Sequence, residues 1–351
     1  MGYKNFGTIS GGVIGLGGTR GNSSVARFND STRVRSFKDG AIATGCAFLM
    51  SELEKRDPRI RQPLTSFTYS RDIPMKVGGG WVEYVTSMNI DFGSNGAANG
   101  QVSAPGANGS PVIQMNLEKD TFSTHVFSTV LRVPFVDMQR TQLTGKSLDA
   151  LLTDGVRLAY DKHLDANTYV GMTDYGTQGL INNSDVTASY VAGATAADRL
   201  WSGKTAVQIL DDINSAIEAV WAASGYDRSA IPNHIIIPPA QYNKLASTLV
   251  SSAADKSILT YLEENNIARM NGKELSICAC PWCAGAGVGA TDRMVVYCHD
   301  ERFLAEEELV PLSRTMTSPN IDALAYDSVY MANVSQVEFF YTQTIRYYDG
   351  L

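Results

Sequence analysis

Charged residues are scarce in this chain: they make up 19% of its 351 residues, against about 25% in typical soluble domains. Long apolar runs are missing too. The longest uncharged segment, residues 92–117, is rich in Gly, Asn and Ser and cannot supply the ~20 apolar residues of a membrane span. The N-terminus has no leucine-rich segment, so we expect no signal peptide and folding in the cytoplasm. We expect no membrane partner.

The residue patterns of common enzymes are also missing. The four histidines are scattered, and neither HExxH nor GxSxG occurs. Two segments, residues 145–147 and 203–205, resemble the end of a phosphate-binding loop. Arg140 and Asp198 stand where each loop needs its first glycine. We therefore predict no catalytic residue, no cofactor-binding residue and no cofactor.

The cysteines argue against a disulfide framework because their number is odd. They are Cys46, Cys278, Cys280, Cys283 and Cys298. The last four, together with His299, could ligate zinc, and Cys280-Pro-Trp-Cys283 has the spacing of a redox motif. A glycine-rich loop follows it where a redox motif has a helix, so we favour inert thiols and predict no metal ligand. A metal-binding enzyme that uses these cysteines is the alternative.

Positive charge is concentrated at the start of the chain. Residues 1–62 contain ten basic and five acidic side chains, a net charge of +5, which leaves −12 for the rest of a chain with net charge −7. A basic arm on an acidic body can bind nucleic acid or another copy of the same body. Ordinary variation of surface charge is the alternative.

The order of expected elements indicates an α+β fold, with strands and helices segregated. Alternation in residues 81–92 and 112–117, around a turn-rich segment ending at Pro111, predicts a long hairpin. A further strand region closes at Val136. An apolar stripe predicts a long helix over 147–170 and a second over 204–222. Shorter strands and a helix follow, and residues 334–348 are rich in strand-forming aromatic residues.

Several short strings appear in the order typical of one protein family. They are residues 179–183 (GLINN), Trp201, 237–242 (IPPAQY), 261–266 (YLEENN) and 291–297 (TDRMVVY). With the basic arm, hairpin and long helix before them, they resemble the major capsid proteins of tailed double-stranded DNA bacteriophages, which have the Hong Kong 97-like fold. Residues 1–178 match this family by architecture only.

The resemblance implies a division of the chain into functional parts. Residues 1–62 would be the N-terminal arm, and 63–199 a peripheral domain with an E-loop (about 76–119) and a spine helix (about 147–170). Residues 200–325 would be the axial domain, and 326–351 a strand that returns to the peripheral domain.

The implied function is structural. Copies of the chain would assemble as hexamers and pentamers into an icosahedral virion capsid around packaged double-stranded DNA, in the host cytoplasm. The implied partners are a portal, packaged DNA without sequence specificity, and a separate scaffolding or decoration protein if one exists. An encapsulin-like nanocompartment shell shares the fold and is an alternative. Some capsids of this family link an E-loop lysine to a neighbouring chain. Residues 77–118 contain no lysine, so we expect no such link.

Overall fold

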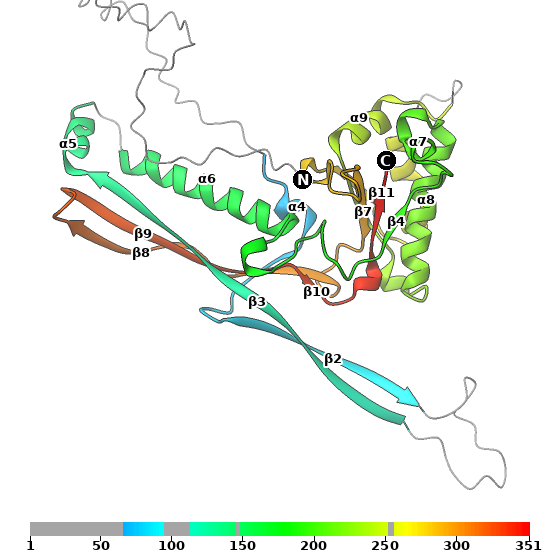
Figure 1. Cartoon of the computed structure of the whole chain (residues 1–351), viewed down its shortest axis with the longest axis horizontal. Helices are drawn as coiled ribbons and strands as arrows, with labels where there is room; N and C mark the ends of the chain where they lie inside the picture. The colour runs from blue at the N-terminus through cyan, green and yellow to red at the C-terminus, as the bar shows by residue number, and fades with distance from the viewer. Residues whose placement is uncertain (1–65, 95–112, 145–147, 252–255) are drawn as a thin grey trace, which may run out of the picture. The chain divides into compact units, whose positions relative to one another are not determined.

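Two β-sheets, each packed against its own helices, form the described part of the chain (Figure 1). The computed structural model describes residues 66–94, 113–144, 148–251 and 256–351, all within the unit Ser66–Leu351. The predicted arm, Cys46 and most of the predicted hairpin tip lie outside these residues. The mixture of helices and sheets confirms the expected α+β class. No helix of the described residues is long and apolar enough to cross a membrane.

The strands of the first sheet are β1 (Met75–Val77), β2 (Tyr84–Ser94), β3 (Ile113–Pro134), β8 (Leu304–Asn320), β9 (Ala325–Ser335) and β10 (Glu338–Phe339). Those of the second are β4 (Ala188–Tyr190), β5 (His234–Ile237), β6 (Ser276–Ala279), β7 (Arg293–Tyr297) and β11 (Ile345–Asp349). The α-helices are α4 (Tyr69–Asp72), α5 (Phe135–Thr144), α6 (Leu148–Tyr169), α7 (Ala196–Arg199), α8 (Ala206–Ala223), α9 (Pro239–Ser247), α10 (Ile258–Glu264) and α11 (Ile267–Met270). The 3-10 helices are η1 (Thr173–Tyr175), η2 (Trp201–Gly203), η3 (Arg228–Ala230), η4 (Pro281–Cys283) and η5 (Thr342–Thr344).

Strand β3 belongs to two pairings in succession. The first sheet has the order β1-β8-β9-β3-β2, with β10 beside β8. The first half of β3 pairs antiparallel with β2, from Ser94↔Ile113 to Tyr84↔Ser123. From Thr124 onward it pairs with β9 instead. The predicted hairpin is present in β2 and β3. The further strand expected up to Val136 is the continuation of β3, which ends at Pro134 where α5 begins.

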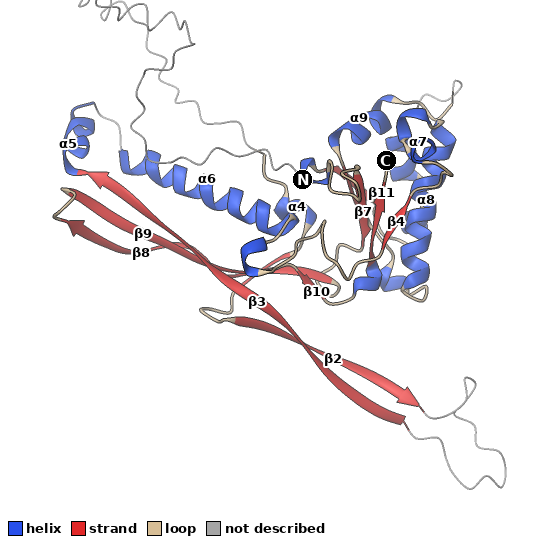
Figure 2. Ribbon diagram, in the orientation of Figure 1, coloured by secondary structure: helices blue, strands red, loops and turns tan. Residues whose placement is uncertain are grey.

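The long predicted helix is α6, which begins and ends within one residue of the expected 147–170. The helix runs alongside the first sheet (Figure 2), and its apolar stripe packs on β3, β8 and β9. Tyr160 and Leu164 lie against Ala332 and Val334. Toward the start of the helix, half-buried side chains cover Leu131, Val133 and Tyr330. The covering of this half of β3 is therefore supplied within the chain.

A buried carboxyl group joins α6 to β8. Glu306 is fully buried and accepts hydrogen bonds from Asn167 Nδ2 at 2.7 Å and Thr168 Oγ1 at 2.5 Å. Burial raises the pKa of Glu306 to about 7, although these two bonds act in the opposite direction. Glu338 in β10 lies near enough to add to the effect, and burial raises its own pKa to about 7.

The second sheet has the order β4-β11-β7-β5-β6 and is buried on both faces. Helix α8, predicted over 204–222, begins with a capping box between Thr205 and Gln208. Its fully buried Ile209, Ile213 and Ile217 share one core with residues of β5, β6 and β7. The opposite face of the sheet packs against Tyr169, at the end of α6, and Ile73, just after α4.

The C-terminal segment, residues 326–351, contributes strands to both sheets. Strands β9 and β10 join the first sheet, but β11 pairs with β7 and β4 in the second. Likewise β8 belongs to the first sheet, although it lies within the predicted axial segment 200–325. An alternating pattern predicts a strand but not its partner, because pairing between distant segments depends on the whole fold.

A buried ion pair holds β11 beside β7. The Arg293 guanidinium donates to both carboxylate oxygens of Asp349, at 2.7 and 2.9 Å, and the two side chains are 9% and 1% exposed. The same guanidinium donates to the Ile181 carbonyl and stacks on the Tyr347 ring. Because the pair is bidentate and buried, removing one partner would leave an unpaired buried charge and lower the free energy of unfolding.

We predict that Asp349→Ala lowers the free energy of unfolding by about 3–5 kcal/mol, because it leaves Arg293 buried without its carboxylate. Urea unfolding of the unassembled chain measures this. The matched control is Asp327→Ala, which breaks a bidentate pair between Arg132 and Asp327 that lies at the surface. Equal losses in the two variants would contradict the prediction.

We predict that Glu306→Gln makes stability less dependent on pH. The folded-state pKa of Glu306 is raised to about 7 from an ordinary value of 4.5. The folded chain therefore holds more protons than the unfolded chain between these values, and stability falls as pH rises through this window. In the uncharged variant the free energy of unfolding should no longer decrease through the ionisation of residue 306. The variant should therefore be more stable than the wild type at pH 8. Unfolding at pH 5 and 8 tests this, with exposed Glu301→Gln as control. A wild-type slope retained in Glu306→Gln would refute it.

Candidate functional site: an apolar hairpin face and a buried Asp–His–Cys cluster

Six large apolar side chains lie on one face of the β2–β3 ribbon. Directly opposed residues of an antiparallel pair point to the same face, and so do residues two apart. The register places Ile90 opposite Leu117 and Phe92 opposite Met115. We define the hairpin apolar face as Met88, Ile90, Phe92, Ile113, Met115 and Leu117. Each of these side chains is between 54% and 74% exposed.

The opposite face of the same ribbon is polar. It carries Asn89, Gln114, Asn116, Glu118 and Asp120. The Asn89 amide donates to the Asp120 carboxylate across the two strands, and the Asn116 amide donates to Glu118. The ribbon is thus amphipathic, and the described residues of one chain leave its apolar side exposed to solvent.

An uncovered apolar face on a two-stranded ribbon indicates a docking surface. Two strands alone are marginally stable in water, and apolar sheet faces are normally buried against another layer. Contiguous exposed apolar surface of this kind marks sites of protein–protein interaction. The alternation that predicts the strands also predicts this amphipathicity, and only the structure shows that the apolar side is left open.

The cysteines that the sequence singled out do not form one site. Cys280 and Cys283 are buried in the core around η4, where the pKa of Cys283 is raised by its contact with Cys280 and by burial. Cys298 is buried elsewhere and accepts from Lys273 Nζ at 3.4 Å. Within the described residues, no three of the four cysteines and His299 meet as metal ligands. The structure therefore does not support the zinc alternative built on them.

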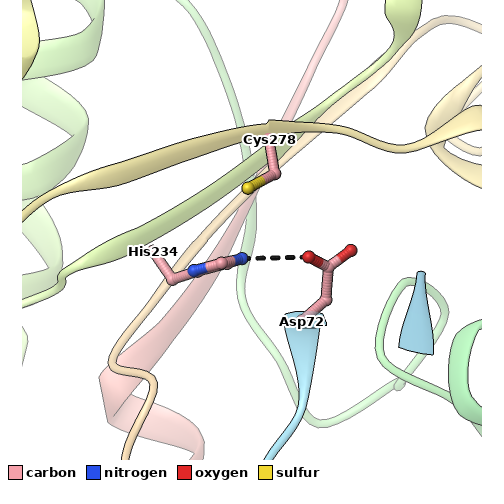
Figure 3. A group of neighbouring side chains, drawn as sticks. All are labelled: Asp72, His234 and Cys278. Atoms are coloured by element: carbon pink, nitrogen blue, oxygen red, sulfur yellow. Dashed lines mark hydrogen bonds and ion pairs between the residues drawn. The ribbon is translucent and has the colours of Figure 1, made fainter. Parts of the chain in front are cut away.

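One group of potential ligands does meet, and the sequence did not predict it. Asp72, His234 and Cys278 bring a carboxylate oxygen, an imidazole nitrogen and a sulfur within 4.8 Å of one another (Figure 3). His234 Nε2 lies 3.1 Å from Asp72 Oδ1. Asp72 ends α4, whereas the other two residues lie on neighbouring parallel strands β5 and β6. No spacing rule connects residues 162 and 44 positions apart, so the cluster is invisible in the sequence.

The charges around the cluster favour its ionised form. Burial opposes ionisation of Asp72, but hydrogen bonds from His234, Arg71 and Tyr169 lower its pKa. Burial also opposes the charged form of His234, yet its contacts with Asp72 and Cys278 raise its pKa. Burial opposes ionisation of Cys278 too, but its contacts with His234 and Ser276 and the charge of Arg71 together lower the thiol pKa. An imidazolium can therefore be stabilised between two anionic groups.

The sequence matches one known protein family over most of its length. A family model described as "Major capsid protein" matches residues 96–351. This match covers well over half of the chain, and the protein belongs to the major capsid protein family. No curated protein matches the sequence.

Solved structures confirm the Hong Kong 97-like capsid fold. The capsid of Myoviridae phage XM1 aligns with a TM-score of 0.71 at 19% identity, covering 86% of this chain and 98% of that one. The capsid of a native GTA particle aligns with a TM-score of 0.58 at 12% identity, covering 84% and 94%. A structure from Microbacterium phage Oxtober96 gives 0.56 at 9% identity, covering 86% and 97%.

The family match and the fold together confirm the resemblance inferred from the sequence. The chain is a structural capsid shell protein. The nanocompartment alternative is not favoured by these matches. In such a protein the surfaces that meet other copies are the functional site, and the hairpin apolar face is the best-defined candidate among the described residues.

We predict that Met115→Asp blocks assembly without unfolding the chain. Met115 is 57% exposed, so the change should alter the stability of the single chain by no more than about 0.5 kcal/mol. A charge on the apolar face would have to be buried in the assembled state, which is costly. Electron microscopy and thermal unfolding measure the two effects. Gln114→Asp adds the same charge to the polar face and should still assemble. Normal particles from Met115→Asp would contradict the assigned role.

Proposed function

We propose that copies of this chain assemble as hexamers and pentamers and close into an icosahedral shell around packaged double-stranded DNA. The observation that carries this proposal is the hairpin apolar face, which needs a covering surface that the described residues of one chain do not supply. If the ribbon of each chain lies on the neighbouring chain, the hairpin apolar face is buried in every copy. Repetition of one contact around a closed ring requires no partner other than the chain itself.

The parts of the chain take distinct roles in this proposal. Residues 76–119 act as the E-loop that reaches the neighbour, and α6 acts as the spine helix of the peripheral domain. The second sheet with α8 forms the core of the axial domain. This assignment moves β8 to the peripheral domain and β11 to the axial domain, following the sheets that they join.

The basic arm, residues 1–62, fits two roles that depend on its charge of +5. It can contact the acidic body of other copies, or it can neutralise DNA phosphates without reading sequence. A portal through which DNA enters, and a scaffolding or decoration protein, are further partners in this proposal. Assembly takes place in the host cytoplasm, and the chain performs no catalysis of its own.

Electron microscopy of the purified full-length chain tests the proposal. Closed shells of uniform diameter are the expected result, with the exposed hairpin face covered in a reconstruction of the particle. Chains that stay monomeric under all assembly conditions would refute self-closure. Particles in which the hairpin face is open to solvent would refute its assigned role and leave the family assignment intact.

We predict that the shell contains no covalent links between chains. A linking amine would have to stand near the hairpin tip, and residues 77–118 contain no lysine. Lys76 lies in β1 with its amine 5.3 Å from the Phe340 ring centroid, and Lys119 stands opposite Met88 in the ribbon. Particles boiled in denaturing detergent should give one band near 38.0 kDa. A ladder of higher bands would contradict the prediction, and unboiled particles serve as the control for assembly.

A further inference from the structure

The Asp72–His234–Cys278 cluster is not used by the shell function, yet its three side chains form an incomplete ligand set. They offer one oxygen, one nitrogen and one sulfur, all within 4.8 Å of one another (Figure 3). Hard cations prefer oxygen alone, whereas a thiolate with an imidazole selects borderline-soft divalent ions. We propose that this cluster binds one such ion, with Zn²⁺ as the fitting case.

The distances suit a tetrahedral ion with little rearrangement. Zinc bonds of about 2.0–2.3 Å place neighbouring ligand atoms roughly 3.3–3.8 Å apart. His234 Nε2 and Asp72 Oδ1 are already 3.1 Å apart, and one ligand atom of each of the three residues lies within 4.8 Å of the other two. Small side-chain rotations therefore bring all three atoms to bonding distance. Cys278 is half-buried, which leaves a route from solvent for the ion and for a water as fourth ligand.

The backbone holds the ligands on rigid elements. His234 and Cys278 lie on adjacent parallel strands and face the same side of the second sheet, two positions apart in register. The carbonyl of Asp72 accepts from the buried Tyr297 hydroxyl, and its Oδ2 accepts from the Tyr169 hydroxyl. The bond from Tyr169 orients the carboxylate so that Oδ1 faces His234, a support typical of ligating carboxylates.

A competing cation occupies the carboxylate in the metal-free chain. Arg71 donates Nε to Asp72 Oδ1 at 2.6 Å and Nη2 to Oδ2 at 2.9 Å. Its side chain is 43% exposed and can turn into solvent. When the metal ion binds, it replaces the Arg71 guanidinium as the positive group at Asp72 Oδ1. The thiol proton of Cys278, and any proton on His234 Nε2, leave to solvent as the bonds to the metal form.

A bound ion would connect two parts of the fold. Asp72 directly precedes β1 and the hairpin in the chain, whereas the other two ligands belong to the second sheet. The ion would add three bonds at a junction that hydrogen bonds otherwise hold. This role does not depend on shell assembly, so the proposal can be tested on unassembled full-length chains and can fail while the shell function stands.

The first test is metal analysis of the full-length chain without a histidine tag, after dialysis against Zn²⁺ and then buffer. A single zinc ion per chain is expected. Cobalt(II) loading should give thiolate-to-metal charge-transfer absorption and the d–d bands of a tetrahedral site. Cys278→Ser should abolish the absorption, whereas the matched control Cys298→Ser should keep it. A metal-free wild-type chain, or identical cobalt spectra in Cys278→Ser and wild type, would overturn the proposal.

A second variant keeps the test decisive if Cys278→Ser fails to fold. Arg71→Gln removes the competing positive charge but no ligand, so it should tighten Zn²⁺ binding by at least about tenfold. Competition with a chromogenic chelator measures the dissociation constant. If Arg71 and Asp72 form only a structural ion pair, the variant should bind no more tightly than the wild type. That result would overturn the proposal, as would an apo and a zinc-loaded wild type with the same unfolding temperature.

Discussion

The continuity of β3 is the constraint on which the rest of the structure depends. One strand of 22 residues pairs first with β2 and then with β9. Because side chains alternate along a strand with a period of two, the face of the hairpin is fixed by the way the same strand enters the core. The docking surface and the packed core are therefore two ends of one backbone element.

The same alternating pattern gives exposed apolar side chains at one end of β3 and buried ones at the other. Apolar residues occupy odd positions at both ends, yet Met115 is 57% exposed and Leu131 is 4% exposed. The difference is that side chains of α5 and α6 cover Leu131, whereas no described part of the chain covers Met115. A subunit of a shell has to leave such surface open, since a chain that covered all its apolar faces would have none left for its neighbours.

Local patterns predicted much of this fold. Alternation located the hairpin, and a helical stripe located α6 to within a residue, because both signals lie within one segment. The partners of β8 and β11 could not be predicted, since their pairing joins segments far apart in the chain. The cluster of Asp72, His234 and Cys278 could not be predicted either, because its residues also come from segments far apart in the chain. The cysteine spacing drew attention to Cys280 and Cys283, and the structure places both in the buried core beside the second sheet.

The register of the hairpin also limits how its sequence can change in evolution. Ile90 faces Leu117, and Phe92 faces Met115, in a ladder that is continuous from Tyr84 to Ser94. Because the core fixes the later half of β3, deleting a single residue between Leu117 and Thr121 would turn the β3 side chains on the tip side of the deletion to the opposite face. Polar groups would then replace the apolar ones on the docking side. Length changes within these strands should therefore survive only in pairs, whereas apolar-for-apolar exchange can proceed freely and lead related shells to diverge in sequence.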